Sequence, residues 1–314
     1  MRPITTTLNT SEKRLYHEWA WALRTDQRQS LLDTVLQELS DYFGVTQDEA
    51  LRRAELGDEK LKEEWLALDP RTPEEIADFY KASPTYIYEL MYWHSCVNDS
   101  RPLLYVPSVR LAHAAGAIRY LDFGSGVGSQ GLLFAKHGME VTLADIAPQM
   151  LDFCRWRFKR HGVAATFLDL NVQSLPRDYY DFITAMEVLE HVPDPFETIR
   201  TLVGALRYGG MLYFSAPFRE DSLRPMHVVT QPSALWAIRS LGLERVSARI
   251  PDPTFHVYRR VRRPQAVSNV LAGLDHVTSN ALVDHLTHFG QRARNKLVYE
   301  WGRLQRKGQA EQQP

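Results

Sequence analysis

The chain has 314 residues, of which 44% are hydrophobic and 24% are charged, and this composition excludes an intrinsically disordered protein and a collagen-like repeat. Its 37 Lys and Arg residues are balanced by 38 Asp and Glu residues, so no global positive charge is available to attract a nucleic acid. The length is sufficient for one large domain with an appendage, or for two domains.

The N-terminal residues and the cysteines indicate the compartment. Residues 1–14 lack the basic start and the apolar run of a secretory signal. The chain has 2 cysteines, Cys96 and Cys154, which are too few for a disulfide framework and lack the spacing of a metal site. Its apolar runs are far shorter than the roughly 18 residues that suggest a membrane-spanning helix. We therefore expect a cytoplasmic protein.

Residues 11–115 carry a helical pattern. In segments 31–39 and 74–80, apolar residues recur at intervals of three and four. Thr72 precedes Pro73, and Glu75 follows three residues after Thr72, which predicts a capped helix start. Residues 1–110 contain 13 basic and 19 acidic residues, an excess of acids typical of a solvated helical surface. We therefore expect an all-helical N-terminal section over residues 1–115.

An aromatic group lies in the C-terminal part of this section and consists of Tyr86, Tyr88, Tyr92, Trp93 and His94. These side chains could form a lid, or a binding surface, over a flat or apolar acceptor molecule. Alternatively, they could be core anchors between helices. The sequence leaves both interpretations open.

At Arg119 the pattern changes to short apolar strands that alternate with helical stretches. The predicted strands are 119–123, 140–144, 165–168, 181–186 and 211–216, and the predicted helices between them are 129–137, 148–161 and 195–207. A further helix, 234–242, precedes two more predicted strands, 243–250 and 254–261. This alternation predicts an α/β fold with a seven-stranded, mostly parallel sheet.

A glycine-rich turn follows the first predicted strand. Gly124, Gly126 and Gly128 allow a close approach of the backbone to a ligand, and the following helix start directs N–H groups toward it. Ser129 stands where the dinucleotide-binding fingerprint requires Gly or Ala. Asp122 lies two residues before the first glycine and suits a ligand with an ammonium group better than a pyrophosphate, which it would repel.

Two further acids follow the next two strands. Asp145, at the end of the second strand, could accept hydrogen bonds from both hydroxyls of a ribose. Asp169, at the end of the third strand, could accept from the exocyclic amine of an adenine, between Leu168 and Leu170. For Asp169, a helix cap or a loop acid is the alternative.

These motifs together resemble a known family. The sequence LDFGSGVG at 121–128, the acids Asp145 and Asp169, and FITAMEVLEHVPDP at 182–195 are similar to the class I S-adenosylmethionine-dependent methyltransferases. The similarity is greatest to the small-molecule branch that includes the ubiquinone-biosynthesis O-methyltransferases, and it covers roughly residues 117–262. It implies a Rossmann-like sheet with an antiparallel last strand, across whose carboxyl edge S-adenosyl-L-methionine lies.

The resemblance also implies roles for individual residues. Asp122 and the glycines would hold the methionine part of the cofactor, Asp145 the ribose and Asp169 the adenine. Met186 and Glu187 would line the cofactor on the acceptor side. The implied cofactor-binding residues are Asp122, Gly124, Ser125, Gly126, Gly128, Asp145, Ile146, Asp169, Leu170 and Met186.

The segment 187–191 brings two glutamates near a histidine. If it is helical, Glu187, Glu190 and His191 lie on one face. His227 falls where related methyltransferases often carry an acceptor-side histidine. These four residues, Glu187, Glu190, His191 and His227, could hold Mg or Mn, and such an ion would lower the pKa of an acceptor hydroxyl.

A metal-free interpretation stands beside this one. Glu190 and His191 would then only shape the loop, and either His191 or His227 would act as a general base, because imidazole titrates near neutral pH. The candidate catalytic residues are therefore Glu187, His191 and His227.

From residue 264 onward, apolar residues recur at helical spacing and predict an amphipathic tail. Residues 255–314 contain 10 basic and 4 acidic residues, so the tail could dock on the protein itself or contact a membrane surface peripherally. We expect three parts: the helical section 1–115, an S-adenosylmethionine-binding domain 116–263 and a basic tail 264–314.

The sequence favours a methyltransferase that acts on an oxygen of a small or lipophilic metabolite. A metal-assisted RNA 3′-end methyltransferase is an alternative, opposed by the near-neutral charge and the absence of RNA-reading aromatic motifs. An NAD-binding oxidoreductase is opposed by Ser129 and Asp122, and a non-catalytic S-adenosylmethionine-binding protein is the last alternative. The expected partner is a small-molecule acceptor, and the sequence does not set the oligomeric state.

Overall fold

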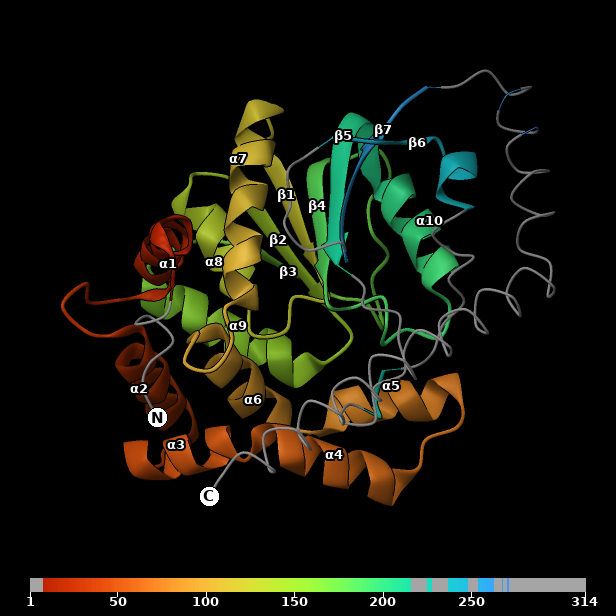
Figure 1. Ribbon diagram of the computed structural model, residues 1–314. Helices are drawn as coiled ribbons and strands as arrows, with labels where there is room; N and C mark the ends of the chain where they lie inside the picture. Colours follow the sequence, from red (N-terminus) through yellow and green to blue (C-terminus); the bar gives the residue numbers. More distant parts are fainter. Residues whose placement is uncertain are drawn as a thin grey trace, which may run out of the picture.

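The computed structural model describes residues 8–215, 225–227, 237–247 and 254–262, together with Val267 and Val270. In this part of the chain, a twisted sheet lies between helices, and a group of N-terminal helices packs along one side of it and beneath its carboxyl edge (Figure 1). No helix in these ranges is both long and apolar enough to cross a membrane. The predicted tail falls outside these ranges apart from Val267 and Val270, whose side chains are exposed.

The sheet has the predicted number of strands and the predicted direction of pairing. Its order is β3-β2-β1-β4-β5-β7-β6, in which the first five are parallel and β7 runs antiparallel to both of its neighbours. The strands are β1 (Arg119–Phe123), β2 (Glu140–Asp145), β3 (Thr166–Asp169), β4 (Tyr180–Met186), β5 (Leu206–Ser215), β6 (Leu243–Arg245) and β7 (Phe255–Arg260). The α/β fold class is therefore confirmed.

The helices fall into an N-terminal group and a group that connects strands. The first contains α1 (Thr10–Leu23), α2 (Leu31–Phe43), α3 (Gln47–Glu55), α4 (Gly57–Leu68), α5 (Pro73–Ala82), α6 (Thr85–His94), the 3-10 helix η2 (Arg101–Tyr105) and α7 (Val106–Ala114). The second contains α8 (Ser129–Lys136), α9 (Pro148–His161), α10 (Pro195–Ala205) and the 3-10 helix η3 (Ala237–Leu241). The predicted cap is confirmed, because Thr72 and Glu75 form a reciprocal capping box at the start of α5.

Three elements differ from the prediction by more than two residues, and the other boundaries differ by two or fewer. β5 begins at Leu206 instead of residue 211, because α10 ends at Ala205 and Gly209 takes a left-handed conformation that extends the strand through an irregular register. The predicted helix 234–242 is a 3-10 helix over Ala237–Leu241, and its first residues lie outside the described ranges. β6 is shorter than predicted, and residues 248–250 also lie outside these ranges.

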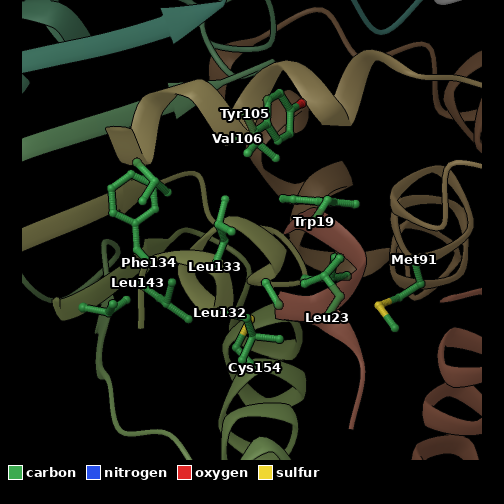
Figure 2. Close-up of a cluster of buried hydrophobic side chains, with 14 of the residues drawn as sticks. Trp19, Leu23, Met91, Tyr105, Val106, Leu132, Leu133, Phe134, Leu143 and Cys154 are labelled. Carbon is green, nitrogen blue, oxygen red and sulfur yellow. The ribbon is translucent and has the colours of Figure 1, made fainter. Parts of the chain in front are cut away.

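Successive residues of the strands serve two different cores. Tyr120 and Phe182 belong to a core that contains α8 and α9, whereas Leu121 and Ile183 belong to a second core with α10. The first core also includes the N-terminal helices: Trp19, Met91 and Tyr105 pack in the same cluster as Leu132 and Phe134 of α8 (Figure 2). The N-terminal helices thus share a hydrophobic core with one face of the sheet, and the expected division into parts stays a prediction.

A buried ionic group also joins the N-terminal helices to the sheet domain. Glu38 of α2 and Arg157 of α9 are each 0% exposed and form an ion pair of 2.9 Å. The second carboxylate oxygen of Glu38 lies 2.6 Å from Nε2 of His161. Arg157 Nη1 donates at 2.9 Å to the carbonyl of Val127 and to the hydroxyl of Ser129. A charge on α2 is therefore linked to the backbone of the glycine-rich turn.

Candidate functional site

The glycine-rich turn joins β1 to α8 and needs glycine for two reasons. Gly124 and Gly126 have φ values of +67° and +50°, in the left-handed region that other residues rarely adopt. A Cβ at Gly124 would lie 2.5 Å from Val188 Cγ2, and one at Gly126 would lie 2.9 Å from Leu90 Cδ1. Helix α6 therefore packs directly against the turn.

The turn faces a cavity whose walls come from two distant parts of the chain. The N-terminal helices supply Asp58, Leu61, Tyr80, Tyr86, Glu89, Leu90, Trp93, His94 and Tyr105. The sheet domain supplies Asp122, Phe123, Gly124, Ser125, Gly126, Gln130, Asp145, Ile146, Ala147, Met150, Leu170, Met186, Glu187, Val188, His191, Val192, Met226 and His227. No lysine or arginine of the described residues lines this cavity, so its charged side chains are acidic apart from any protonated histidine.

Asp122, in the strand β1 that leads into the turn, is held in place by two hydrogen bonds. Its carboxylate accepts from the N–H of Gly131 at 3.0 Å and from the hydroxyl of Thr184 at 3.3 Å. The side chain is 4% exposed, and burial raises the pKa of its carboxyl to about 7. This acid therefore lines the cavity close to its protonation midpoint at neutral pH.

Asp145 and Asp169 sit side by side at the ends of β2 and β3 but have different surroundings. The two oxygens of Asp145 accept from the N–H groups of Gly126 and Ala147, each at 2.9 Å, and burial raises the pKa of this carboxyl. The carboxylate of Asp169 instead accepts from the backbone and the side chain of Asn171, and it does not line the cavity. Its geometry is that of a loop acid, and its contact with an adenine stays a prediction.

The other predicted cofactor residues divide in the same way. Ser125, Ile146, Leu170 and Met186 line the cavity together with Gly124 and Gly126. Gly128 does not: a Cβ there would lie 2.9 Å from Cys154 Sγ, so this glycine allows the start of α8 to pack on α9. Eight of the ten predicted cofactor residues therefore face one cavity, and Gly128 and Asp169 do not.

The segment 187–191, after β4, is a turn and not a helix. The prediction that its two glutamates and its histidine share one helix face is therefore wrong. Glu187 has a φ of +53°, and Pro193 restricts the residue before it, so a helix cannot run through the segment. Glu187 Oε1 accepts from Arg101 at 2.9 Å and from the hydroxyl of Ser215 at 2.6 Å. Glu187 therefore faces Arg101 and Ser215 and does not join Glu190 and the histidines.

Glu190, His191 and His227 do come together. One potential ligand atom from each lies within 4.8 Å of the others. The two imidazole rings are 4.8 Å apart and nearly perpendicular, and Glu190 is 0% exposed. The Tyr80 hydroxyl of α5 lies 2.6 Å from His191 Nδ1, and the carbonyl of Met226 lies 3.3 Å from the same nitrogen. Tyr80, His191, Met226 and His227 line the cavity, whereas Glu190 is buried behind its lining.

The aromatic group of α6 divides between the cavity and the core, and its role as a lid over an acceptor stays a prediction. Tyr86, Trp93 and His94 line the cavity. Tyr88 is a core anchor that stacks on Phe43 at 4.5 Å. Burial lowers the pKa of His94 to about 3, so this ring is neutral beside the Ser129 hydroxyl at 2.9 Å.

Sequence reasoning missed several residues of the site, among them Tyr80, Arg101 and Gln130. Gln130 follows the glycine turn directly, and that position was the available signal. Tyr80 and Arg101 carry no comparable signal, because they reach the site only through packing of distant segments.

Comparisons with known proteins show what this chain is similar to. A family model described as a methyltransferase domain matches residues 121–214. The ubiquinone biosynthesis O-methyltransferase of Xanthomonas euvesicatoria pv. vesicatoria (strain 85-10) is 30% identical over 173 residues, which cover 52% of this chain and 67% of that protein. The enzyme of the same name from Xanthomonas campestris pv. campestris (strain B100) is 28% identical over 184 residues, which cover 56% of this chain and 72% of that protein. Among solved structures, the 1,6-didemethyltoxoflavin-N1-methyltransferase of Burkholderia thailandensis aligns at a TM-score of 0.44 and 19% identity, over 62% of this chain and 92% of that one.

Proposed function

Because the chain belongs to the S-adenosylmethionine-dependent methyltransferases, we propose that it methylates an oxygen of a small or lipophilic metabolite in the cavity between the sheet and the N-terminal helices. When bound, S-adenosylmethionine supplies a reactive methyl group on a sulfonium. The work of the protein is then to orient the acceptor, to exclude water and to remove a proton.

The residues at the glycine turn fit this cofactor. Ser125 Oγ and Gln130 Oε1 are buried at the cavity and have no hydrogen-bond partner among the described residues, which is expected where a polar ligand completes the site. Asp122 and the glycine turn would hold the methionine part, and Asp145 would hold the ribose. Leu170 would contact the adenine.

The observation that carries the choice of oxygen is the contact between Tyr80 and His191. A backbone carbonyl can only accept, so the carbonyl of Met226 near Nδ1 favours a proton on that nitrogen of His191. The Tyr80 hydroxyl donates to the same carbonyl at 3.4 Å, so its oxygen is available to accept the hydrogen of Nδ1, and a neutral His191 then carries no proton on Nε2. An unprotonated Nε2 can accept the proton of an acceptor hydroxyl, as a general base requires.

The first experiment tests the cofactor by calorimetric titration with S-adenosylmethionine, S-adenosylhomocysteine and NADH. We expect micromolar binding of the first two, lost in Asp145→Ala and retained in the control Asp152→Ala, an exposed acid on α9. Binding of NADH alone, or of none of the three, would overturn the assignment. The acceptor is then sought by transfer of a labelled methyl group to phenols, catechols and hydroxyquinols. Methylation of these in the wild type but not in His191→Asn supports the proposal, and transfer to amines alone contradicts it.

The approach of Glu190, His191 and His227 favours metal assistance as a second candidate. Two imidazoles and one carboxylate suit Mn²⁺ better than Mg²⁺, which prefers oxygen ligands. The ion would lower the pKa of an acceptor hydroxyl. Chelation that abolishes methyl transfer, restored by Mn²⁺ in the wild type but not in Glu190→Gln, supports this candidate, whereas transfer unaffected by a chelator refutes it. An RNA 3′ end is a poor acceptor here, since the described cavity lining is acidic and would repel phosphates.

A further inference from the structure

Gln130, the second residue of α8, has the nitrogen of its side-chain amide hydrogen-bonded to Ser108, whereas its amide oxygen has no partner among the described residues. The residue is 5% exposed and lines the cavity. Its Oε1 is buried and accepts no hydrogen bond from any residue that the structure describes. A buried amide oxygen that stays without a partner costs free energy, so such an atom at a cavity indicates a ligand donor.

The hydrogen bonds on the far side of Gln130 fix which way the amide points. The hydroxyl of Ser108 donates its one hydrogen to the backbone carbonyl of Tyr105. The Ser108 oxygen, at 3.1 Å from the amide nitrogen of Gln130, must therefore act as the acceptor. Only the NH₂ group of the amide can donate to this acceptor, so the amide oxygen, and not the nitrogen, is the atom left for a ligand.

The position of Gln130 narrows the identity of the donor. The next residue, Gly131, gives its N–H to Asp122, so Gln130 and Asp122 belong to the same end of the cavity, at β1. Asp145, the candidate for the ribose, lies at the end of the neighbouring strand β2. S-Adenosylmethionine offers hydrogen-bond donors at its ammonium, its ribose hydroxyls and its adenine amine. Among these donors, only the ammonium belongs to the methionine part of the cofactor, which is assigned to the end of β1. The carboxylate of the methionine part has no hydrogen to donate to the amide oxygen.

We propose that Gln130 is a cofactor-positioning residue whose amide oxygen accepts a hydrogen bond from the ammonium group of S-adenosylmethionine, in an orientation set by Ser108 and Tyr105. The inference rests on the proposed placement of the cofactor. Ser108 lies in α7 and Tyr105 in η2, so the N-terminal section fixes the orientation of a group that faces the cofactor.

The test compares two thioether ligands by calorimetry: S-adenosylhomocysteine, and the same molecule without its α-amino group. In Gln130→Leu, we expect the affinity for S-adenosylhomocysteine to fall roughly 10- to 100-fold, the effect of losing a hydrogen bond to a charged group. The affinity for the analogue should change by less than about twofold, because this ligand never made the contact. Gln130→Glu keeps an acceptor, adds a negative charge and should retain binding of S-adenosylhomocysteine.

The remaining outcomes separate the failures. Equal weakening of both ligands in Gln130→Leu, or no weakening of either, would overturn the role of Gln130 while the cofactor assignment stands. Failure of the wild type to bind S-adenosylhomocysteine would overturn the cofactor assignment itself and the present inference with it. If Gln130→Leu does not fold, Ser108→Ala serves in its place: the amide should then turn freely, with a smaller loss confined to S-adenosylhomocysteine. Loss confined to the analogue, or shared by both ligands, contradicts the proposal.

Discussion

Replacement of Glu38 by Gln tests whether the buried ionic group holds the N-terminal helices to the sheet domain. The substitution keeps the size of the side chain and removes its charge, so Arg157 would remain 0% exposed without a counter-ion. The Val127 carbonyl and the Ser129 hydroxyl would still bond Arg157, but neutral dipoles offset only part of a buried charge. Breaking a buried ion pair from one side costs about 3–5 kcal/mol. That is a large share of the roughly 5–15 kcal/mol that stabilises a typical protein.

Urea unfolding followed by tryptophan fluorescence at pH 7 measures this loss. Glu197→Gln is the matched control, because Glu197 and Arg200 form an ion pair in which both side chains are 57% exposed. The control should change the free energy of unfolding by less than about 1 kcal/mol. A loss below about 1 kcal/mol for Glu38→Gln as well would refute the reasoning. The double variant Glu38→Leu/Arg157→Met, which buries neither charge, should be more stable than the two single variants predict by addition.

The same group sets a direction for the pH dependence of stability. Burial alone would raise the pKa of Glu38, but the charge of Arg157 and the hydrogen bond to His161 lower it below its ordinary 4.5. Burial lowers the pKa of His161 below its ordinary 6.5. In both cases the unfolded chain takes up protons first, so stability falls on acidification, from about pH 6.5 for His161 and from about pH 4.5 for Glu38. Glu38→Gln should lose the lower part of this dependence, and a profile identical to that of the wild type would contradict the assignment.

Three further predictions concern the cavity and its support. Since the pKa of Asp122 is about 7, binding of the cationic cofactor near neutral pH should release a proton from this carboxyl. The calorimetric heat of binding should then depend on the ionisation enthalpy of the buffer in the wild type and less so in Asp122→Asn, and equal dependence in both would contradict the proton release. Gly131→Ala places a Cβ 2.4 Å from Leu143 Cδ2 and should destabilise the fold by about 1–3 kcal/mol in urea. The double variant Gly131→Ala/Leu143→Ala should lose less stability than the two single variants predict by addition, and unchanged stability of Gly131→Ala would mean that α8 shifts freely on the sheet. Tyr80→Phe should lower kcat and shift the pH profile of kcat, because Tyr80 contacts His191, while the affinity for the cofactor stays constant. A lower affinity for the cofactor would contradict this role of Tyr80.

Local signals predicted the half of the cavity that belongs to the sheet domain. β1 and α9 occur at the predicted residues, because a strand that ends in a glycine turn and a helix that begins with Pro148 and ends before Gly162 are each defined within a few residues. Two cavity residues of this half, Asp122 and Asp145, lie in the carboxyl ends of β1 and β2. Their position could be read from the chain order alone.

The other half depends on contacts between distant residues. Tyr80 lies 111 positions from its partner His191, and no periodicity relates the two. The sequence places Glu187 on one face with Glu190 only if the segment is helical. The left-handed backbone of Glu187 itself prevents this helix. For Glu38 a signal was present: it shares the buried face of α2 with Leu31 and Val35, and an acid on an apolar face indicates a buried partner. The sequence does not identify that partner as Arg157.

The two-sided construction of the cavity limits how such an enzyme can change its acceptor during evolution. Helices α4, α5 and α6 supply side chains that line the cavity, and α6 also carries Met91 into the core shared with α8. Loss or exchange of α6 would open that core and remove the contact of Leu90 with the glycine turn. A single substitution at the cavity residue Leu61, which packs in a separate cluster with Trp65 and Phe79, leaves both intact. Divergence of acceptor choice on this scaffold would therefore proceed by replacing side chains one at a time, while the helices that carry them are retained.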